Sequence, residues 1–169
     1  MRGFNALFKK EVVSLKDNRI IGSLKDICFD YDGRLIAIII KSKNVLNTDR
    51  IYKTNNVKSF TKDCIELKDA TSYEKKLAQE FLFAGDVIGL VVRSRDQILG
   101  ICDNIYFNLR DRRVTGISMS KGFLLDVYDG TQIIPFEDLK VNKKFILCPP
   151  QKKLKVYNGG IRNILKREE

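Results

Sequence analysis

Apolar and polar residues alternate in short runs along most of this chain, a two-residue period typical of half-buried β-strands. In the first half the expected strands are 11–15, 20–29, 35–40, 51–52, 57–60 and 64–67. In the second half they are 87–93, 97–108, 114–120, 131–136 and 144–148. Asp30-Tyr31-Asp32-Gly33 is the clearest turn, because Asp-Gly readily adopts the positive φ angles of a tight hairpin. Gly22, inside an expected strand, predicts a bulge or bend. The pattern predicts a mainly all-β fold.

The two halves of the chain resemble one another. Ile21–Asp30 matches Leu99–Asn108, and Gly22 and Gly100 lie 78 positions apart. An ungapped match at this spacing pairs Ile27 with Ile105, Phe29 with Phe107, Ile36 with Val114 and Ile39 with Ile117. Farther on, Val57 matches Leu139 and the spacing is 82, so the second half has a longer middle loop. A repeat of roughly 70 residues exceeds the usual solenoid period, which favours two compact domains.

These patterns divide the chain into four segments. The first repeat is expected at 8–70 and the second at 85–148, with a helical linker at 71–84 and a basic tail at 149–169. In the linker, Thr71 and Glu74 fit a capping box, and Tyr73, Leu77 and Phe81 form an apolar stripe at helical spacing. We expect this helix to pack across the junction of the two modules. For the tail, a short docked helix and a flexible arm are both open.

The chain is strongly basic, with 31 Lys and Arg against 21 Asp and Glu and a net charge of +10. Such a surface attracts anions in general, including nucleic acid and anionic lipid, but a solvated basic surface without a dedicated partner is an equal alternative. If RNA binds, two basic stretches are the best candidates for the contact. Their residues are Arg110, Arg112 and Arg113 in a predicted hairpin turn, and Lys152, Lys153 and Lys155 in the tail.

The composition argues against an enzyme. The chain contains no His, which excludes Ser–His and Cys–His nucleophile pairs, and it has no glycine loop of the kind that cradles phosphates. Cys28, Cys64, Cys102 and Cys148 lie far apart and form no Cys-x-x-Cys pair, so we expect reduced, partly buried thiols and no metal site. No catalytic residue, cofactor or small-molecule substrate is expected.

The same features bear on location. No apolar run reaches the length of about 20 residues that a membrane-spanning helix needs, and the N-terminus does not fit a signal peptide. Together with the unpaired cysteines, this predicts a cytoplasmic protein.

Each half resembles a PRC-barrel domain, a small β-barrel module. The family pattern of a glycine-containing strand, an acidic turn and a hydrophobic strand is matched by Ile21–Asp30 and the residues that follow. The family's Ile-Pro-Phe-Asp segment is similar to Gln132–Leu139, which precedes the strand Phe145–Leu147. The first repeat has Ile51-Tyr52-Lys53-Thr54 at that place, and the second has Asn104 where the first has Asp26.

The resemblance implies two tandem PRC-type β-barrels and a role as an adaptor. The family includes the cytoplasmic domain of the reaction-centre H subunit, the C-terminal domain of a ribosome-maturation factor and sporulation-associated bacterial proteins. The function expected first is therefore a non-enzymatic adaptor or scaffold that binds another macromolecule, with a protein as its partner. The alternative is an RNA- or ribosome-associated factor that uses the basic surface, and contact with an anionic membrane surface is a third option.

Overall fold

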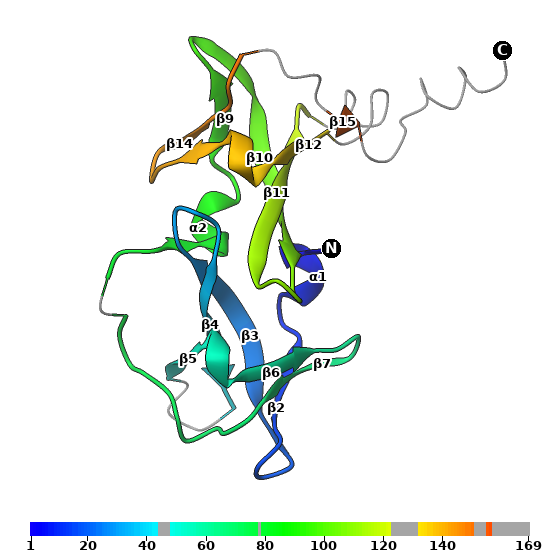
Figure 1. Cartoon of the computed structure of the whole chain (residues 1–169), viewed down its shortest axis with the longest axis vertical. Helices are drawn as coiled ribbons and strands as arrows, with labels where there is room; N and C mark the ends of the chain where they lie inside the picture. Colours follow the sequence, from blue (N-terminus) through cyan, green and yellow to red (C-terminus); the bar gives the residue numbers. More distant parts are fainter. Residues whose placement is uncertain (44–47, 78, 123–131, 151–154, 157–169) are drawn as a thin grey trace, which may run out of the picture.

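The computed structural model describes residues 1–43, 48–77, 79–122, 132–150 and 155–156, and shows two β-sheets stacked along the long axis of the molecule (Figure 1). The first repeat contains β1 (Arg2–Gly3), α1 (Phe4–Leu7), β2 (Glu11–Ser14), β3 (Arg19–Phe29), β4 (Leu35–Ser42), β5 (Asp49–Lys53), η1 (Thr54–Asn56), β6 (Val57–Phe60) and β7 (Cys64–Leu67). The second contains β8 (Leu82–Phe83), α2 (Ala84–Val87), β9 (Val91–Ser94), β10 (Gln97–Asn108), β11 (Arg113–Ser120), β12 (Gln132–Pro135), η2 (Phe136–Asp138), β13 (Lys140–Val141), β14 (Phe145–Leu147) and β15 (Lys155–Val156).

The two sheets have the same topology. The first runs in the order β5-β4-β3-β2-β7-β6, and the second runs β12-β11-β10-β9-β14-β13, with β15 added beside β12. In each sheet one pair is parallel, β2 with β7 and β9 with β14, whereas the other neighbours are antiparallel. The predicted all-β fold of two tandem barrels is confirmed. No helix among the described residues is long and apolar enough to cross a membrane.

The repeats exchange their first strands. β1 opens the first repeat but pairs with β10 of the second, placing Gly3 opposite Tyr106. In the same way β8 opens the second repeat but pairs with β3 of the first, placing Phe83 opposite Cys28. Cys28 and Tyr106 are 78 positions apart, so the two exchanges are equivalent. Each repeat therefore completes the sheet of the other.

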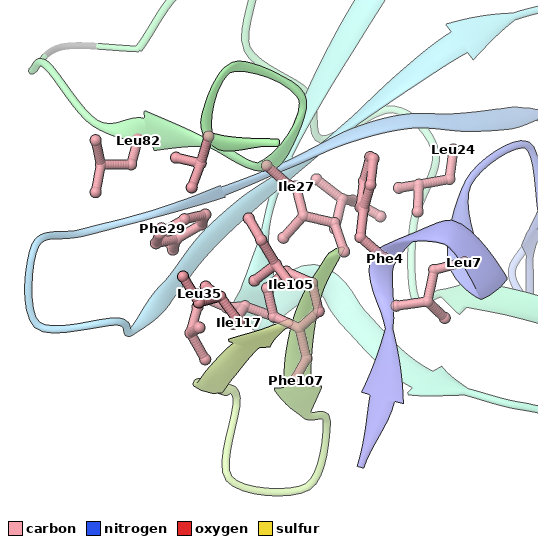
Figure 2. Close-up of a cluster of buried hydrophobic side chains, with 14 of the residues drawn as sticks. Phe4, Leu7, Leu24, Ile27, Phe29, Leu35, Leu82, Ile105, Phe107 and Ile117 are labelled. Atoms are coloured by element: carbon pink, nitrogen blue, oxygen red, sulfur yellow. The ribbon is translucent and has the colours of Figure 1, made fainter. Parts of the chain in front are cut away.

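The exchange unites the two repeats around one hydrophobic core. Buried side chains of both repeats belong to a single cluster, and Figure 2 shows Phe4 and Ile27 of the first repeat beside Ile105 of the second. Phe29 and Phe107 occupy matching positions and meet edge to face, with ring centroids 6.3 Å apart. We call this contact region, with the paired turns Asp30–Arg34 and Asn108–Arg113, the seam. The two repeats, predicted as two compact domains, thus share a core.

The ungapped match between the repeats is wrong beyond the first long strand. Phe29 pairs with Leu35 across the first hairpin, and Phe107 pairs with Val114 across the second. Leu35 rather than Ile36 is therefore the counterpart of Val114, at a spacing of 79. The second hairpin turn contains one more residue, which loops accept at little entropic cost. The later spacing of 82 is confirmed by the matching turns η1 and η2.

The helix predicted at 71–84 is also wrong. The described part of this segment, which omits residue 78, contains no helical residue before it reaches β8 and the first residue of α2. Glu74 exchanges two backbone hydrogen bonds with Ile51, at 2.8 and 3.1 Å, while Leu77 and Phe81 pack against an outer cluster that includes Cys28. Leu77 and Phe81 are half-buried without helix formation and Tyr73 stays exposed, because tertiary contacts outweigh the weak propensity of a short isolated helix.

Gly22 and Gly100 allow the strands to cross closely. A Cβ at Gly22 would lie 2.2 Å from the carbonyl oxygen of Lys41, and one at Gly100 would lie 2.4 Å from that of Ser120. Register shifts accompany both glycines, opposite Val12 in the first sheet and beside Ile98 in the second. The bulge predicted at Gly22 is therefore confirmed, and the second repeat has its equivalent.

Candidate macromolecule-binding surface

The predicted basic hairpin lies in the seam. Asn108 shapes the turn, because its Oδ1 accepts hydrogen bonds from the backbone N–H groups of Arg110 and Asp111 at 3.1 and 3.4 Å. The turn then meets the Asp30–Arg34 turn of the first repeat. The N–H of Leu35 donates to the carbonyl of Arg112 at 2.9 Å, and the N–H of Val114 donates to that of Gly33 at 2.7 Å. These two bonds hold the two turns together.

The three arginines of this turn differ in their surroundings. Arg112 is half-buried, and its Nη2 donates to the carbonyl of Val57 at 3.1 Å. Arg113 is exposed, and its Nη2 donates to the carbonyl of Asp32 at 3.1 Å. Arg110 is exposed at the outer end of the turn. Two of the three predicted binding arginines therefore also link the repeats, a role that the sequence pattern did not indicate.

The structure describes no side-chain position for the three lysines predicted in the tail. Lys152 and Lys153 lie outside the described residues, and for Lys155 only the backbone is described, where it pairs with Ile133 in the sheet. Their proposed contact with RNA stays a prediction.

One side of the turn borders a hollow of about 260 Å³, which we call the basic hollow. One wall is strand β6 and the other is the turn. Its lining residues are Val57, Lys58, Ser59, Phe60, Leu109, Arg110 and Arg112. The lining contains three cationic side chains and no carboxylate among the described residues. Sequence reasoning missed Lys58, because it approaches Arg110 only after two segments about 50 positions apart have folded together.

Other residues of the same turn border a second hollow of about 410 Å³, which we call the acidic hollow. Its charged lining residues are Asp32, Asp111, Glu137 and Arg113. Carboxylates therefore outnumber cations there. The seam therefore borders one basic and one acidic hollow, so a partner would meet a patterned surface rather than a uniformly basic one.

A matched pair of polar side chains holds each exchanged segment in place. Oδ1 of Asp26 accepts hydrogen bonds from the N–H of Ile27 at 2.7 Å and from that of Gly85 in α2 at 3.1 Å. Its counterpart Asn104 accepts equivalent bonds from Ile105 at 2.9 Å and from Asn5 in α1 at 3.2 Å. The difference between Asp26 and Asn104 seen in the sequence therefore lies at the seam.

The two members of this pair differ in charge. Burial raises the pKa of the Asp26 carboxyl because it disfavours the charged form, and nearby Asp86 also raises it, while the backbone N–H donors act in the opposite direction. Because the pKa of Asp26 is raised in the folded state, its protonated carboxyl stabilises the fold. This contribution to the free energy of unfolding is complete below the pKa of an unfolded Asp, about 3.9. It is lost as the pH rises through the native pKa.

Replacing Asp26 with Asn is expected to stabilise the protein at neutral pH. The amide keeps the acceptor oxygen and removes the partly buried charge, as Asn104 already does. We expect the melting temperature to rise by roughly 2–4 °C at pH 7, which corresponds to about 1 kcal/mol in a chain of this size, and the gain to vanish near pH 3. Asp63→Asn, at an exposed site, serves as the control. A lower melting temperature for Asp26→Asn at pH 7 would show that the charged form is the stabilising one.

The cysteines are free thiols, and Cys28, Cys102 and Cys148 are buried. Burial raises the pKa of Cys28 and of Cys102 to about 12, and it also raises the pKa of Cys148. At neutral pH these groups stay protonated, and a protonated thiol is a poor nucleophile. Their position therefore fits a packing role.

The sequence was also compared with known proteins. A search of the curated proteins found no match. The family model of the PRC-barrel domain matches the chain twice, over residues 1–64 and 79–155. The two matches cover most of the sequence and agree with the two sheets of equal topology. The chain therefore belongs to the PRC-barrel family, as a tandem duplication of its domain.

Proposed function

We propose that this protein is a non-enzymatic adaptor that binds another macromolecule, with a protein as its main partner. Domains of this family are known in protein-interaction and ribosome-associated roles, and the family is generally non-catalytic. The observation that carries the proposal is the exposure of large apolar side chains on two equivalent hairpins. Ile98 and Ile101 near the β9–β10 turn are 74% and 50% exposed, and Leu15 and Ile20 near the β2–β3 turn are 45% and 43% exposed.

These two hairpins lie at opposite ends of the molecule (Figure 1). Burying one large aliphatic side chain contributes about 1.5–3 kcal/mol, so a partner that covers Ile98 and Ile101 would gain substantial free energy. Since the seam joins both repeats around one core, the hairpins are held at a fixed separation. A protein with this arrangement is suited to contact two sites at once.

The test is capture of partners by the tagged full chain at physiological salt, with and without RNase. The variant Ile98→Asp with Ile101→Asp is compared with the control Ser72→Asp with Gln79→Asp, which adds the same charge at two exposed positions outside both hairpins and the seam. We expect proteins that remain after RNase treatment with the wild type and the control, and are lost with the hairpin variant. If the Ile98→Asp, Ile101→Asp variant captures the same proteins as the wild type, the proposed docking sites are contradicted.

A second candidate is association with RNA or the ribosome, supported by the net charge of +10 and by the basic hollow. The same experiment separates the two functions. If capture collapses with RNase and with rising salt, RNA is the direct ligand and the adaptor proposal fails. Contact with an anionic membrane stays a prediction, which sedimentation with phosphatidylserine vesicles would test.

A further inference from the structure

The basic hollow is bounded by a sheet edge. β6 is the last strand of the first sheet, and among the described residues it pairs only with β7. The carbonyl at its start, Val57, accepts from Arg112, and the carbonyl of Thr61 just beyond its end accepts from Arg2. Between these two contacts, Lys58, Ser59 and Phe60 line the hollow. An edge strand of this kind can pair with an extended peptide.

The backbone conformation of Arg112 indicates a role for its side chain. Its φ is +52°, in the left-handed region that favours glycine, and its counterpart in the first repeat is Gly33 with φ of +77°. A non-glycine residue in this conformation costs roughly 1–2 kcal/mol. The second repeat has an arginine where the backbone favours glycine, and this arginine lines the basic hollow.

The charges around the hollow favour a peptide over a nucleic acid strand. Lys58, Arg110 and Arg112 attract a carboxylate, and guanidinium groups bind carboxylates in a bidentate geometry. A polyanionic backbone that continued across the turn would meet the acidic hollow, where Asp111 and Glu137 repel it. Phe60 is half-buried and packed against the core, so its ring is not displayed as a stacking platform for bases.

We propose that the basic hollow binds an extended acidic segment of a protein partner. A carboxylate of that segment lies against Arg110 and Arg112, and the peptide backbone runs along the open edge of β6. This inference rests on the proposed adaptor function and adds a second contact, separate from the apolar hairpins, that recognises charge.

The test uses the full chain and a fluorescent peptide of about eight residues that alternates Glu and Val, a length suited to pairing with a short strand. Fluorescence anisotropy is measured for the wild type, for Lys58→Ala with Arg110→Ala, and for the matched control Lys75→Ala with Lys76→Ala. Lys75 and Lys76 are exposed and do not line the hollow, so both variants lose the same charge. We expect binding to weaken about tenfold or more in the hollow variant and less than about twofold in the control.

Two further measurements make the test specific. Arg112→Gly removes the guanidinium and relieves the left-handed backbone, so the fold is retained while peptide binding falls. In NMR spectra, the peptide should shift the amide signals of residues 57–60 and 109–112. An alternating Lys-Val peptide should not bind.

Several outcomes would overturn the proposal. Equal weakening by both double variants would mean that only overall charge attracts the peptide. Tighter, hollow-dependent binding of a uridine oligonucleotide of about ten residues would assign the hollow to RNA. Absence of saturable binding would contradict the proposal, and Lys58 would then serve only to prevent unwanted strand pairing at the sheet edge. The Ile98→Asp, Ile101→Asp variant should bind the peptide normally, so failure at the hairpins and failure at the hollow are distinguishable.

Discussion

Replacing Phe107 with alanine is expected to destabilise the entire chain by about 3–5 kcal/mol, not the second repeat alone. Phe107 is fully buried and packs edge to face against Phe29, its counterpart in the first repeat. Phe29 in turn contacts Phe136 of the second repeat, with ring centroids 5.9 Å apart. Loss of the Phe107 ring therefore opens a cavity on which both repeats border.

Urea unfolding followed by far-ultraviolet circular dichroism measures this effect. We expect one cooperative transition in the wild type and in Phe107→Ala, with a lower midpoint in the variant. Tyr31→Ala is the aromatic control, because its side chain is largely exposed, and its free energy of unfolding should change by no more than about 0.5 kcal/mol. A biphasic curve in which only half of the signal shifts would show that the repeats unfold independently.

Removal of residues 1–8 is expected to destabilise the sheet of the second repeat, although the strands of that repeat begin more than 70 positions later in the sequence. β1 pairs with β10, and α1 contributes the buried side chains of Phe4 and Leu7. Truncation of two such side chains costs about 5–10 kcal/mol, which is comparable to the total stability of a typical domain. Because the two repeats share one core, the deletion should leave the whole chain, the second repeat included, unable to remain folded at 37 °C.

Limited proteolysis with mass spectrometry locates the damage. In the deletion variant we expect early cleavage within 97–120, the β10–β11 region, and the single variant Leu7→Ala should show the same sites at a slower rate. Asn5→Ala removes an exposed side chain from the same helix and serves as the control. Cleavage confined to the first repeat would argue against the exchange of strands.

Local pattern predicted most strands of this fold well. The expected bounds of β6, β7 and β10 agree with the structure, because alternation of apolar and polar residues is a local signal. The exchange of β1 and β8 carries no such signal, since these two-residue strands pair with partners 53 to 105 positions away. The spacing of Leu77 and Phe81 predicts a helix, but partial burial of these two side chains is equally compatible with a non-helical segment.

The candidate site was predictable only in part. The sequence indicated Arg110, Arg112 and Arg113 as a basic turn, and the structure places all three at the seam. It could not indicate that carbonyls of the first repeat accept hydrogen bonds from two of them. Nor could it indicate that Lys58 and an open strand edge complete the basic hollow, because these groups meet only through tertiary folding.

We infer that the two PRC-barrel repeats form one cooperative unit through reciprocal exchange of their first strands. Native-state hydrogen exchange, followed by NMR over a series of low urea concentrations, tests it most directly. We expect the most protected amides of β3 and of β10 to open with the same free energy and the same dependence on urea. Two distinct opening free energies, one for each sheet, would contradict it.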